Sequence, residues 1–324
     1  MSKNAASLRA PALATVLLLT TTACGSPAPS ASGGVPSVVT TTNLVADSVR
    51  RVAGDRVRLE SLMGPGVDPH LYKASESDVR RLAEADLILY SGLHLEGKMG
   101  DILVKMARNR PVVAVTEAVP EEALREPPEF AGLYDPHVWF DVMLWARTVD
   151  PVVEALAKVA PGDAESFREA GEAYEAELEE LDAWVRRRIE EIPPEQRVLV
   201  TAHDAFGYFG RAYGVEVVGI QGISTLAEAG LQDVERVVDL VVERRIPAIF
   251  VESSVPRQAI EAVQAAVQDR GHEVVIGGQL YSDSLGAPNS PEGNYVGAVR
   301  YNVDTIVDAL TGARTGNEEA QDAG

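Results

Sequence analysis

Three of the five histidines in this chain lie in contexts that could present a ligand. His70 ends a Gly-Pro-Gly-Val-Asp-Pro-His segment after an expected strand, His137 lies in Asp-Pro-His-Val-Trp, and His203 follows another expected strand. Asp283, just past the last expected strand, is a fourth candidate. In open α/β sheets, ligands bind beyond the carboxyl ends of the strands. Three neutral imidazoles and one carboxylate suit a borderline cation such as zinc in a four-coordinate site.

Each of these residues also has an interpretation without a metal. A lone histidine in a loop is more often a surface residue or a helix cap than a ligand, and Asp283 could belong to an Asx turn. The glycines and prolines around His70 favour a ligand there, because they fix a turn and leave the ring little freedom to lose. Spacing alone leaves both interpretations open.

The other two histidines are expected to lie outside such a site. His94 lacks a turn that would aim it, so we interpret it as a structural residue or as a neighbour that supports the ligands. His272 is expected to interact with the dipole of the helix that ends beside it. The segment 272–276 begins like the zinc-protease motif but lacks the second histidine, and the chain has neither a phosphate loop nor a Gly-x-Ser-x-Gly motif.

The elements that must position these residues are organised around one long helix, expected at 163–191. Pro161 and Pro193 lie near its two ends. Its apolar side chains recur every three or four residues, at Phe167, Ala170, Tyr174, Leu178, Leu181, Val185 and Ile189. Short β-branched runs alternate with helical patterns on both sides, which indicates parallel sheets. The strands are expected at 38–41, 57–62, 87–90, 112–115, 198–201, 215–218, 248–251 and 274–276.

The predicted fold is therefore α/β, with two lobes, each a mainly parallel sheet flanked by helices, joined by one long rigid helix. Helical patterns at 142–159 and 295–310 precede the linking helix and close the second lobe. The expected divisions are an export signal (1–23), Cys24 with a flexible linker (24–36), an N-terminal lobe (37–160), the linking helix (161–194), a C-terminal lobe (195–313) and a disordered tail (314–324).

Composition limits the possible partners and location. The formal charge of -20 argues against nucleic acid and fits a cationic ligand, although acidity also serves solubility. The only cysteine, Cys24, follows the apolar run in a setting that resembles a bacterial lipoprotein site, with plain secretion as the alternative because Thr21 departs from the usual pattern. We therefore expect a monomer outside the cytoplasm, anchored to the cell membrane through lipidated Cys24. Without further thiols, disulfides and cysteine-bound metals are excluded from the folded part.

Five segments together carry a family pattern: GPGVDPHLY (64–72), ADLILYSGLHLE (85–96), DPHVW (135–139), TAHDAFGYF (201–209) and EGNYV (292–296). From about residue 38 to 310 the chain resembles the zinc/manganese solute-binding lipoproteins of ABC importers (cluster A-I), in particular the TroA-like members. The resemblance implies that His70, His137, His203 and Asp283 hold one metal ion between two lobes. It also implies that the ion passes to the transmembrane subunit of an ABC permease.

The resemblance bears on the choice of metal. Manganese-dedicated relatives usually have a glutamate where this chain has His203, and an imidazole favours zinc. Zinc-dedicated relatives often carry a His-rich loop near 116–135, which here contains no histidine. We expect Zn²⁺, with Mn²⁺ as the alternative. The carboxylates expected to orient the imidazoles, unless they cap helices or lie exposed, are Asp68, Asp141, Asp204 and Glu252.

The predicted function is that of an extracytoplasmic, high-affinity metal-binding protein of an importer. The alternatives are a manganese-specific importer component, a metallohydrolase that uses the same ligands, and a surface adhesin. A catalytic zinc keeps an open position for water, whereas four protein ligands would close its coordination sphere. We therefore expect no enzymatic activity.

Overall fold

The computed structural model describes residues 34–130 and 132–313. The predicted export signal, Cys24 with nearly all of the linker, and the predicted tail lie outside the described residues. Within the described part, no helix combines the length and the apolar character that crossing a membrane requires.

The strands before the long helix form one parallel sheet in the order β2-β1-β3-β4. They are β1 (Ser37–Thr40), β2 (Arg58–Ser61), β3 (Leu87–Tyr90) and β4 (Val112–Ala114). The connecting helices are α1 (Asn43–Ala53), α2 (Glu76–Glu84) and α3 (Gly100–Met106). The central strands β1 and β3 are almost entirely buried, which is typical of parallel strands covered on both faces.

The strands after the long helix form two parallel ladders, β5–β6 and β7–β8, with β5 lying beside β7. They are β5 (Val198–His203), β6 (Glu216–Gln221), β7 (Ala248–Glu252) and β8 (Val275–Leu280), and their helices are α7 (Gly207–Tyr213), α8 (Leu231–Arg244), α9 (Gln258–Asp269) and α10 (Tyr295–Thr311). The sequence prediction ends β5 at Thr201, but the ladder continues to His203, which pairs with Gln221. His203 is therefore fixed by strand pairing rather than by a loop.

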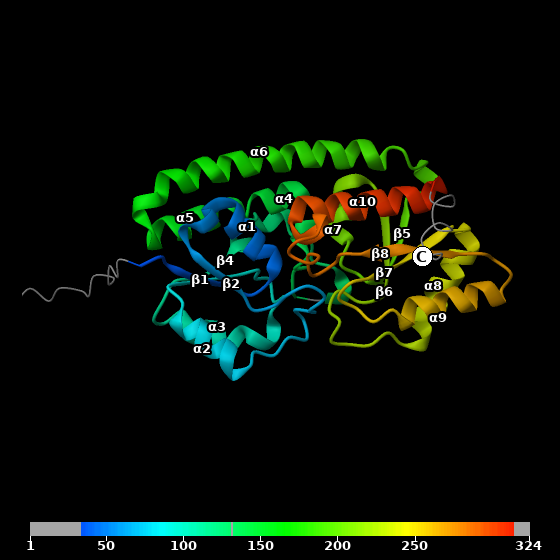
Figure 1. Cartoon of the computed structure of the whole chain (residues 1–324). Coiled ribbons are helices and arrows are strands. Elements are labelled where there is room, and N and C mark those ends of the chain that lie inside the picture. The colour runs from blue at the N-terminus through cyan, green and yellow to red at the C-terminus, as the bar shows by residue number, and fades with distance from the viewer. Residues whose placement is uncertain (1–33, 131, 314–324) are drawn as a thin grey trace, which may run out of the picture. The chain divides into compact units, whose positions relative to one another are not determined.

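The long helix is α6 (Ala164–Ile189), whose 26 residues span roughly 39 Å. Its buried face follows the predicted one except that Gly171 takes the place of Ala170 and that Asp182 is also buried. The helix α5 (Val149–Val159) passes so close there that a Cβ on Gly171 would lie 2.6 Å from Val153 Cγ2. In Figure 1, α6 runs along both groups of strands, and it packs on α1, α5 and α10.

The helix predicted over 142–159 is two helices, α4 (Val142–Ala146) and α5. Pro151 gives the reason, because a proline has no N–H to bond to the carbonyl four residues earlier and its ring clashes with that carbonyl. The Thr148 hydroxyl also donates to the Trp145 carbonyl at 2.7 Å and ends the first helix.

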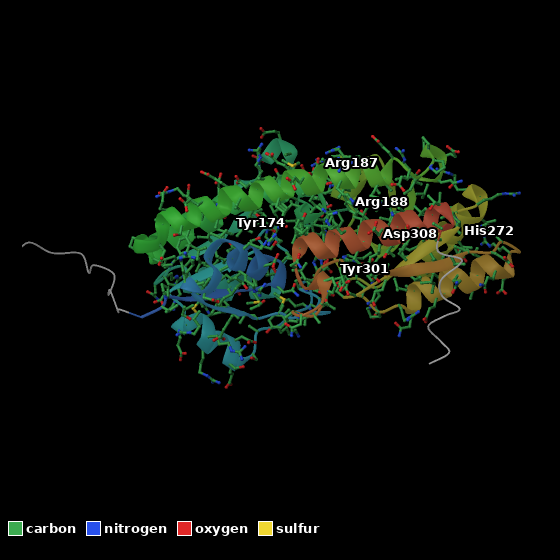
Figure 2. All side chains as sticks on the ribbon, turned by 45° about the horizontal axis from the view of Figure 1, so that its top comes forward. Tyr174, Arg187, Arg188, His272, Tyr301 and Asp308 are labelled. Atoms are coloured by element: carbon green, nitrogen blue, oxygen red, sulfur yellow. The ribbon has the colours of Figure 1, made fainter. Side chains whose placement is uncertain are left out.

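One arginine ties α6 to the closing helix α10. Arg188 donates from Nε to Asp304 Oδ1 at 2.9 Å and from Nη2 to Asp308 Oδ1 at 3.1 Å, and Figure 2 shows Arg188 and Asp308 on the two neighbouring helices. The fold class predicted from the sequence is confirmed, with α6 linking two sets of parallel strands. The lobe boundaries stay a prediction.

Candidate metal centre

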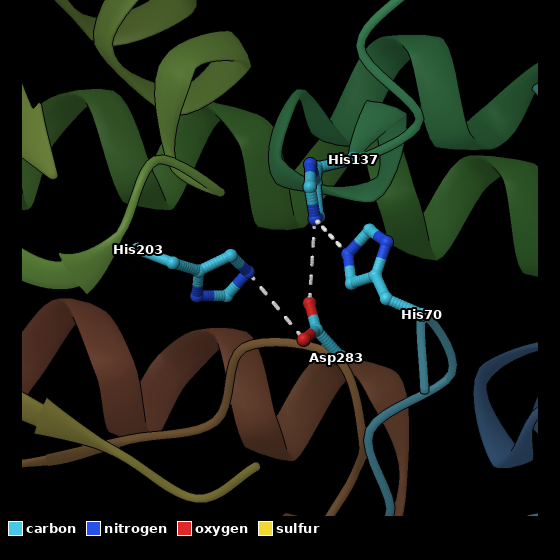
Figure 3. A group of neighbouring side chains, drawn as sticks. All are labelled: His70, His137, His203 and Asp283. Carbon is cyan, nitrogen blue, oxygen red and sulfur yellow. Dashed lines mark hydrogen bonds and ion pairs between the residues drawn. The ribbon is translucent and has the colours of Figure 1, made fainter. Parts of the chain in front are cut away.

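The structure brings together the four side chains that the sequence singles out. His70 lies in the loop between β2 and α2, His137 precedes a short 3₁₀ turn, His203 ends β5, and Asp283 follows β8. One nitrogen or oxygen of each lies within 4.8 Å of the corresponding atoms of the other three (Figure 3). All four residues are buried, with exposed fractions of 4% for His70 and 1% or less for the others.

The distances between these atoms match the edges of a metal coordination polyhedron. His70 Nε2 lies 3.2 Å from His137 Nε2, His137 Nε2 lies 3.5 Å from Asp283 Oδ1, and His203 Nε2 lies 3.4 Å from Asp283 Oδ2. A tetrahedral zinc ion with bonds of 2.0–2.1 Å would place its ligand atoms about 3.3 Å apart. These three separations are close to that value, so the four side chains surround a space of the size that one such ion needs.

Two of these polar atoms have no hydrogen bond to explain their burial. Neither His203 Nε2 nor Asp283 Oδ1 has a properly directed hydrogen-bond partner among the described residues. A buried polar atom without a partner costs about 1–3 kcal/mol, so its retention needs a reason. A bound cation would satisfy both atoms.

Carboxylates hold the other ring nitrogens of two of the imidazoles. Asp135 Oδ1 accepts from His137 Nδ1 at 2.8 Å and from the His137 backbone N–H at 3.0 Å. Glu252 Oε1 accepts from the His203 backbone N–H at 2.8 Å, and Glu252 Oε2 lies 2.6 Å from His203 Nδ1. Such contacts fix the ring orientation and leave Nε2 free for a metal.

Of the four carboxylates that the sequence suggested as partners of the imidazoles, only some contact a histidine. Glu252 contacts its imidazole as predicted. Asp68 instead accepts from the backbone N–H of His70 at 2.8 Å and from the hydroxyl of Thr225 at 2.6 Å. For Asp141 the helix-capping alternative is confirmed, because it caps α4 by accepting from two backbone N–H groups of its first turn. For Asp204 the contact with an imidazole stays a prediction.

The sequence analysis missed Asp135, although a signal for it exists. Asp68 and Asp135 each stand two residues before a histidine, with a proline between, and each accepts the histidine's backbone N–H. This is the Asx turn that aspartate favours. Both Asp-Pro-His segments therefore form the same turn, but only Asp135 also reaches the ring.

Burial and the neighbouring charges set the protonation of the four residues. Burial lowers the pKa of His70 to about 3, so its ring is neutral. Burial also lowers the pKa of His137, but the Asp135 and Asp283 carboxylates outweigh it and the pKa is raised. In the same way the pKa of His203 ends well above its ordinary value because of Glu252 and Asp283. Burial raises the pKa of Asp283, but the His203 and His137 imidazoles hold it well below its ordinary value.

Metal binding near pH 7 is expected to release protons, because a metal ion accepts only neutral imidazoles. The raised pKa values of His137 and His203 favour their protonated forms in the metal-free chain, whereas His70 is already neutral. Affinity should rise with pH while the pH lies below the raised values, and fall as the pH drops. Calorimetric zinc titrations in two buffers of different ionisation enthalpy measure the protons released, and a value of zero would contradict protonated imidazoles.

The remaining histidines lie apart from the four residues. His94 is exposed and lines a separate cavity of about 510 Å³. His272 Nε2 lies 3.1 Å from the carbonyl of Ile246 in the segment before β7. Figure 2 shows His272 at the right-hand end of the molecule. The expected contact with the end of α9 is made by the backbone N–H of His272, which donates to Val267, rather than by its ring.

The chain matches a protein-family model and several known proteins over most of its length. Residues 38–309 match the family model described as zinc-uptake complex component A, periplasmic (ZnuA). The chain is 52% identical to the zinc-binding protein TroA of Treponema pallidum over 86% of this chain and 90% of that protein. It is 48% identical to the manganese-binding lipoprotein MntA of Bacillus subtilis over 89% of this chain and 94% of that protein. The solved structure of the periplasmic zinc-binding protein TroA superposes with a TM-score of 0.84, at 52% identity over 86% of this chain and 99% of that chain.

Proposed function

The chain belongs to the zinc-uptake complex component A family, and on that premise we propose that it binds one divalent metal ion outside the cytoplasm and delivers it to an ABC-type permease. The proposed ligands are His70, His137, His203 and Asp283. The observation that carries this proposal is the convergence of four buried ligand atoms, with His203 Nε2 and Asp283 Oδ1 lacking a hydrogen-bond partner among the described residues.

The donor set favours zinc as the cargo and leaves manganese as the alternative. The relatives' names divide, because one is called zinc-binding and another manganese-binding at similar identity. Three imidazoles and a single carboxylate suit zinc, whereas manganese prefers oxygen ligands and stands lower in the general order of affinity. The separations of 3.2–3.5 Å also fit a tetrahedral zinc ion.

A coordination sphere filled by four protein ligands argues for a metal carrier rather than a metallohydrolase. Four protein ligands would leave no position for a catalytic water. A hydrolase assay on the zinc-loaded chain tests this point, and sustained turnover would contradict it. A surface adhesin would not need four intact ligands, so no feature of the site favours that alternative.

We propose further that Cys24 carries a lipid and that the monomeric chain is anchored at the outer side of the cell membrane. The names of several relatives support this, since MntA of Bacillus subtilis is called a lipoprotein. The permease partner is supported in the same way, because PsaA of Streptococcus mitis is named as a substrate-binding lipoprotein of a manganese ABC transporter.

Competitive metal loading tests the proposed cargo. The metal-stripped chain, residues 25–324, is offered equal zinc and manganese, and bound metal and melting temperature are then measured. We expect one equivalent of zinc and a rise in melting temperature of about 5–10 °C, because a ligand at 100 times its dissociation constant adds about 2.7 kcal/mol. Manganese retained against zinc would reassign the cargo, and a melt unchanged by either metal would refute the proposal.

A further inference from the structure

We propose that Arg125 is a positioning residue of the metal centre. From the space left by Gly207 it holds the carboxylate of Asp135, and through Asp135 it holds the His137 ring in the orientation that metal binding needs. This inference rests on the proposed function, and it adds a residue from the loop between β4 and α4 that touches no proposed ligand directly.

The contacts of Asp135 show why a second anchor matters. Its Oδ1 serves both the ring and the backbone N–H of His137, and its Oδ2 accepts from Arg125 Nη1. Asp135 is fully buried, whereas the Arg125 side chain is 24% exposed. A carboxylate held at both oxygens cannot rotate about its bond to Cβ, so the direction of Oδ1 toward the ring is fixed. Charge-assisted hydrogen bonds of this kind are about twice as strong as neutral ones.

The imidazole of His203, which contacts Glu252, does not need a cation such as Arg125 behind its carboxylate. The longer Glu252 offers one oxygen to the backbone N–H of His203 and the other to its ring, so both oxygens are already engaged by one residue. Asp135 makes both contacts with a single oxygen and leaves Oδ2 for Arg125. The two halves of the site are therefore oriented by different means.

The backbone around Arg125 is anchored separately from its side chain. The Asp135 N–H donates to the Arg125 carbonyl at 2.9 Å, and the Arg125 N–H donates to the Tyr208 hydroxyl at 3.0 Å. That hydroxyl donates in turn to the Asp135 carbonyl at 2.9 Å. These three bonds would remain if the guanidinium moved, so the loop should stay in place when only the side chain is changed.

Gly207, the first residue of α7, provides the space that the guanidinium occupies. A Cβ at this position would lie 1.3 Å from Arg125 Nη1, and the three nearest atoms all belong to the same guanidinium. An added methyl group would therefore displace the flexible end of Arg125 rather than the backbone. Alanine is also well tolerated in a helix, so the substitution should not disturb α7.

Gly207→Ala is the sharpest test because it breaks the Arg125–Asp135 contact while keeping every charge. Truncating Arg125 to alanine would remove a positive charge near the site, which by itself favours binding of a cation. It would also remove the contact that orients Asp135, so the two effects on zinc affinity would oppose each other. We expect Gly207→Ala to weaken zinc binding about tenfold, the lower end of the range for residues that orient ligands. Zinc affinity is measured by competition with a chromophoric chelator, alongside the melting temperature of the metal-free chain.

A double-mutant cycle distinguishes displacement of Arg125 from a general effect on α7. In an Arg125→Ala background there is no guanidinium to displace, so adding Gly207→Ala should change affinity by less than about twofold. A similar loss in both backgrounds, or no loss in either, would overturn the inference. If the unmodified chain bound no metal, the proposed function would fail instead.

Two further measurements exclude a merely structural role. The NMR signal of the His137 Nδ1 proton should shift in Gly207→Ala, whereas the metal-free chain should keep its cooperative melting transition. Arg211→Ala is the matched control, since Arg211 stacks on the same Tyr208 ring, with Cζ 5.0 Å from its centroid, but donates to the Ala123 carbonyl. This control should keep the affinity and the His137 signal of the unmodified chain, and loss of either would count against the inference.

Discussion

Replacing His70 by alanine is expected to lower zinc affinity by at least about 100-fold while the metal-free fold stays intact. Four-ligand structural zinc sites bind with about 10–16 kcal/mol, so one ligand accounts for roughly 3 kcal/mol. The ring of His70 is neutral in the metal-free chain and has no proton to lose before binding, so its removal is not offset by reduced competition from protons. Affinity is measured by chelator competition at about pH 7.

The loop that carries His70 should survive this change because its backbone is held independently. The Gly66 N–H donates to the Ser284 hydroxyl at 2.8 Å, and Asp68 bonds to Thr225 at 2.6 Å. The matched control is His94→Asn, which removes an exposed histidine whose φ of 63° asparagine tolerates. Unchanged affinity in His70→Ala would remove His70 from the site, and a loss in the control would point to a second binding position.

Asp283→Asn is expected to weaken zinc binding by two to three orders of magnitude, although it preserves the shape of the side chain. The carboxylate is the only anionic member of the four and lies within 3.5 Å of both His137 Nε2 and His203 Nε2. Removing one partner of a buried charge pair costs about 3–5 kcal/mol. The amide would also put an NH₂ group among donors that must all face one cation.

The same variant should alter proton release as well as affinity. The Asp283 carboxylate raises the pKa of both His137 and His203, so the amide should leave these rings less protonated and reduce the protons displaced by zinc. Asp304→Asn is the control, because it removes the same charge from a side chain that is half exposed and bonded to Arg188 on α6. Surface pairs of that kind contribute about 0–1 kcal/mol, so zinc binding should not change. Equal affinities in Asp283→Asn and the unmodified chain would exclude a ligand role for Asp283.

The sequence by itself determined the long helix and the alternation of strands and helices. The buried face of α6 follows the 3.6-residue period at Phe167, Tyr174, Leu178, Leu181, Val185 and Ile189. The prediction failed at Ala170, because α5 passes so close to α6 that Gly171 lies there instead. The prediction also missed the break before α5, because the effect of Pro151 was not considered. Periodicity reports which side of a helix is buried, but not how near the neighbouring helix comes.

The sequence also singled out the four side chains that converge at the site. Strand direction made His203 and Asp283 candidates, because the carboxyl ends of parallel strands meet at one edge of a sheet, and the family pattern then favoured the metal interpretation. For His70 and His137 the signal was the rigid turn and the family pattern around each.

Only the tertiary structure decided which residues hold the imidazoles. Glu252 is 49 residues from His203, and Arg125 meets Asp135 only where Gly207 leaves room. The sequence analysis named Asp141, which caps a helix, and passed over Asp135, which orients His137. A local pattern shows that a carboxylate is near a histidine in sequence, but the direction of its oxygens depends on packing between distant segments, which tolerates little change in volume or position.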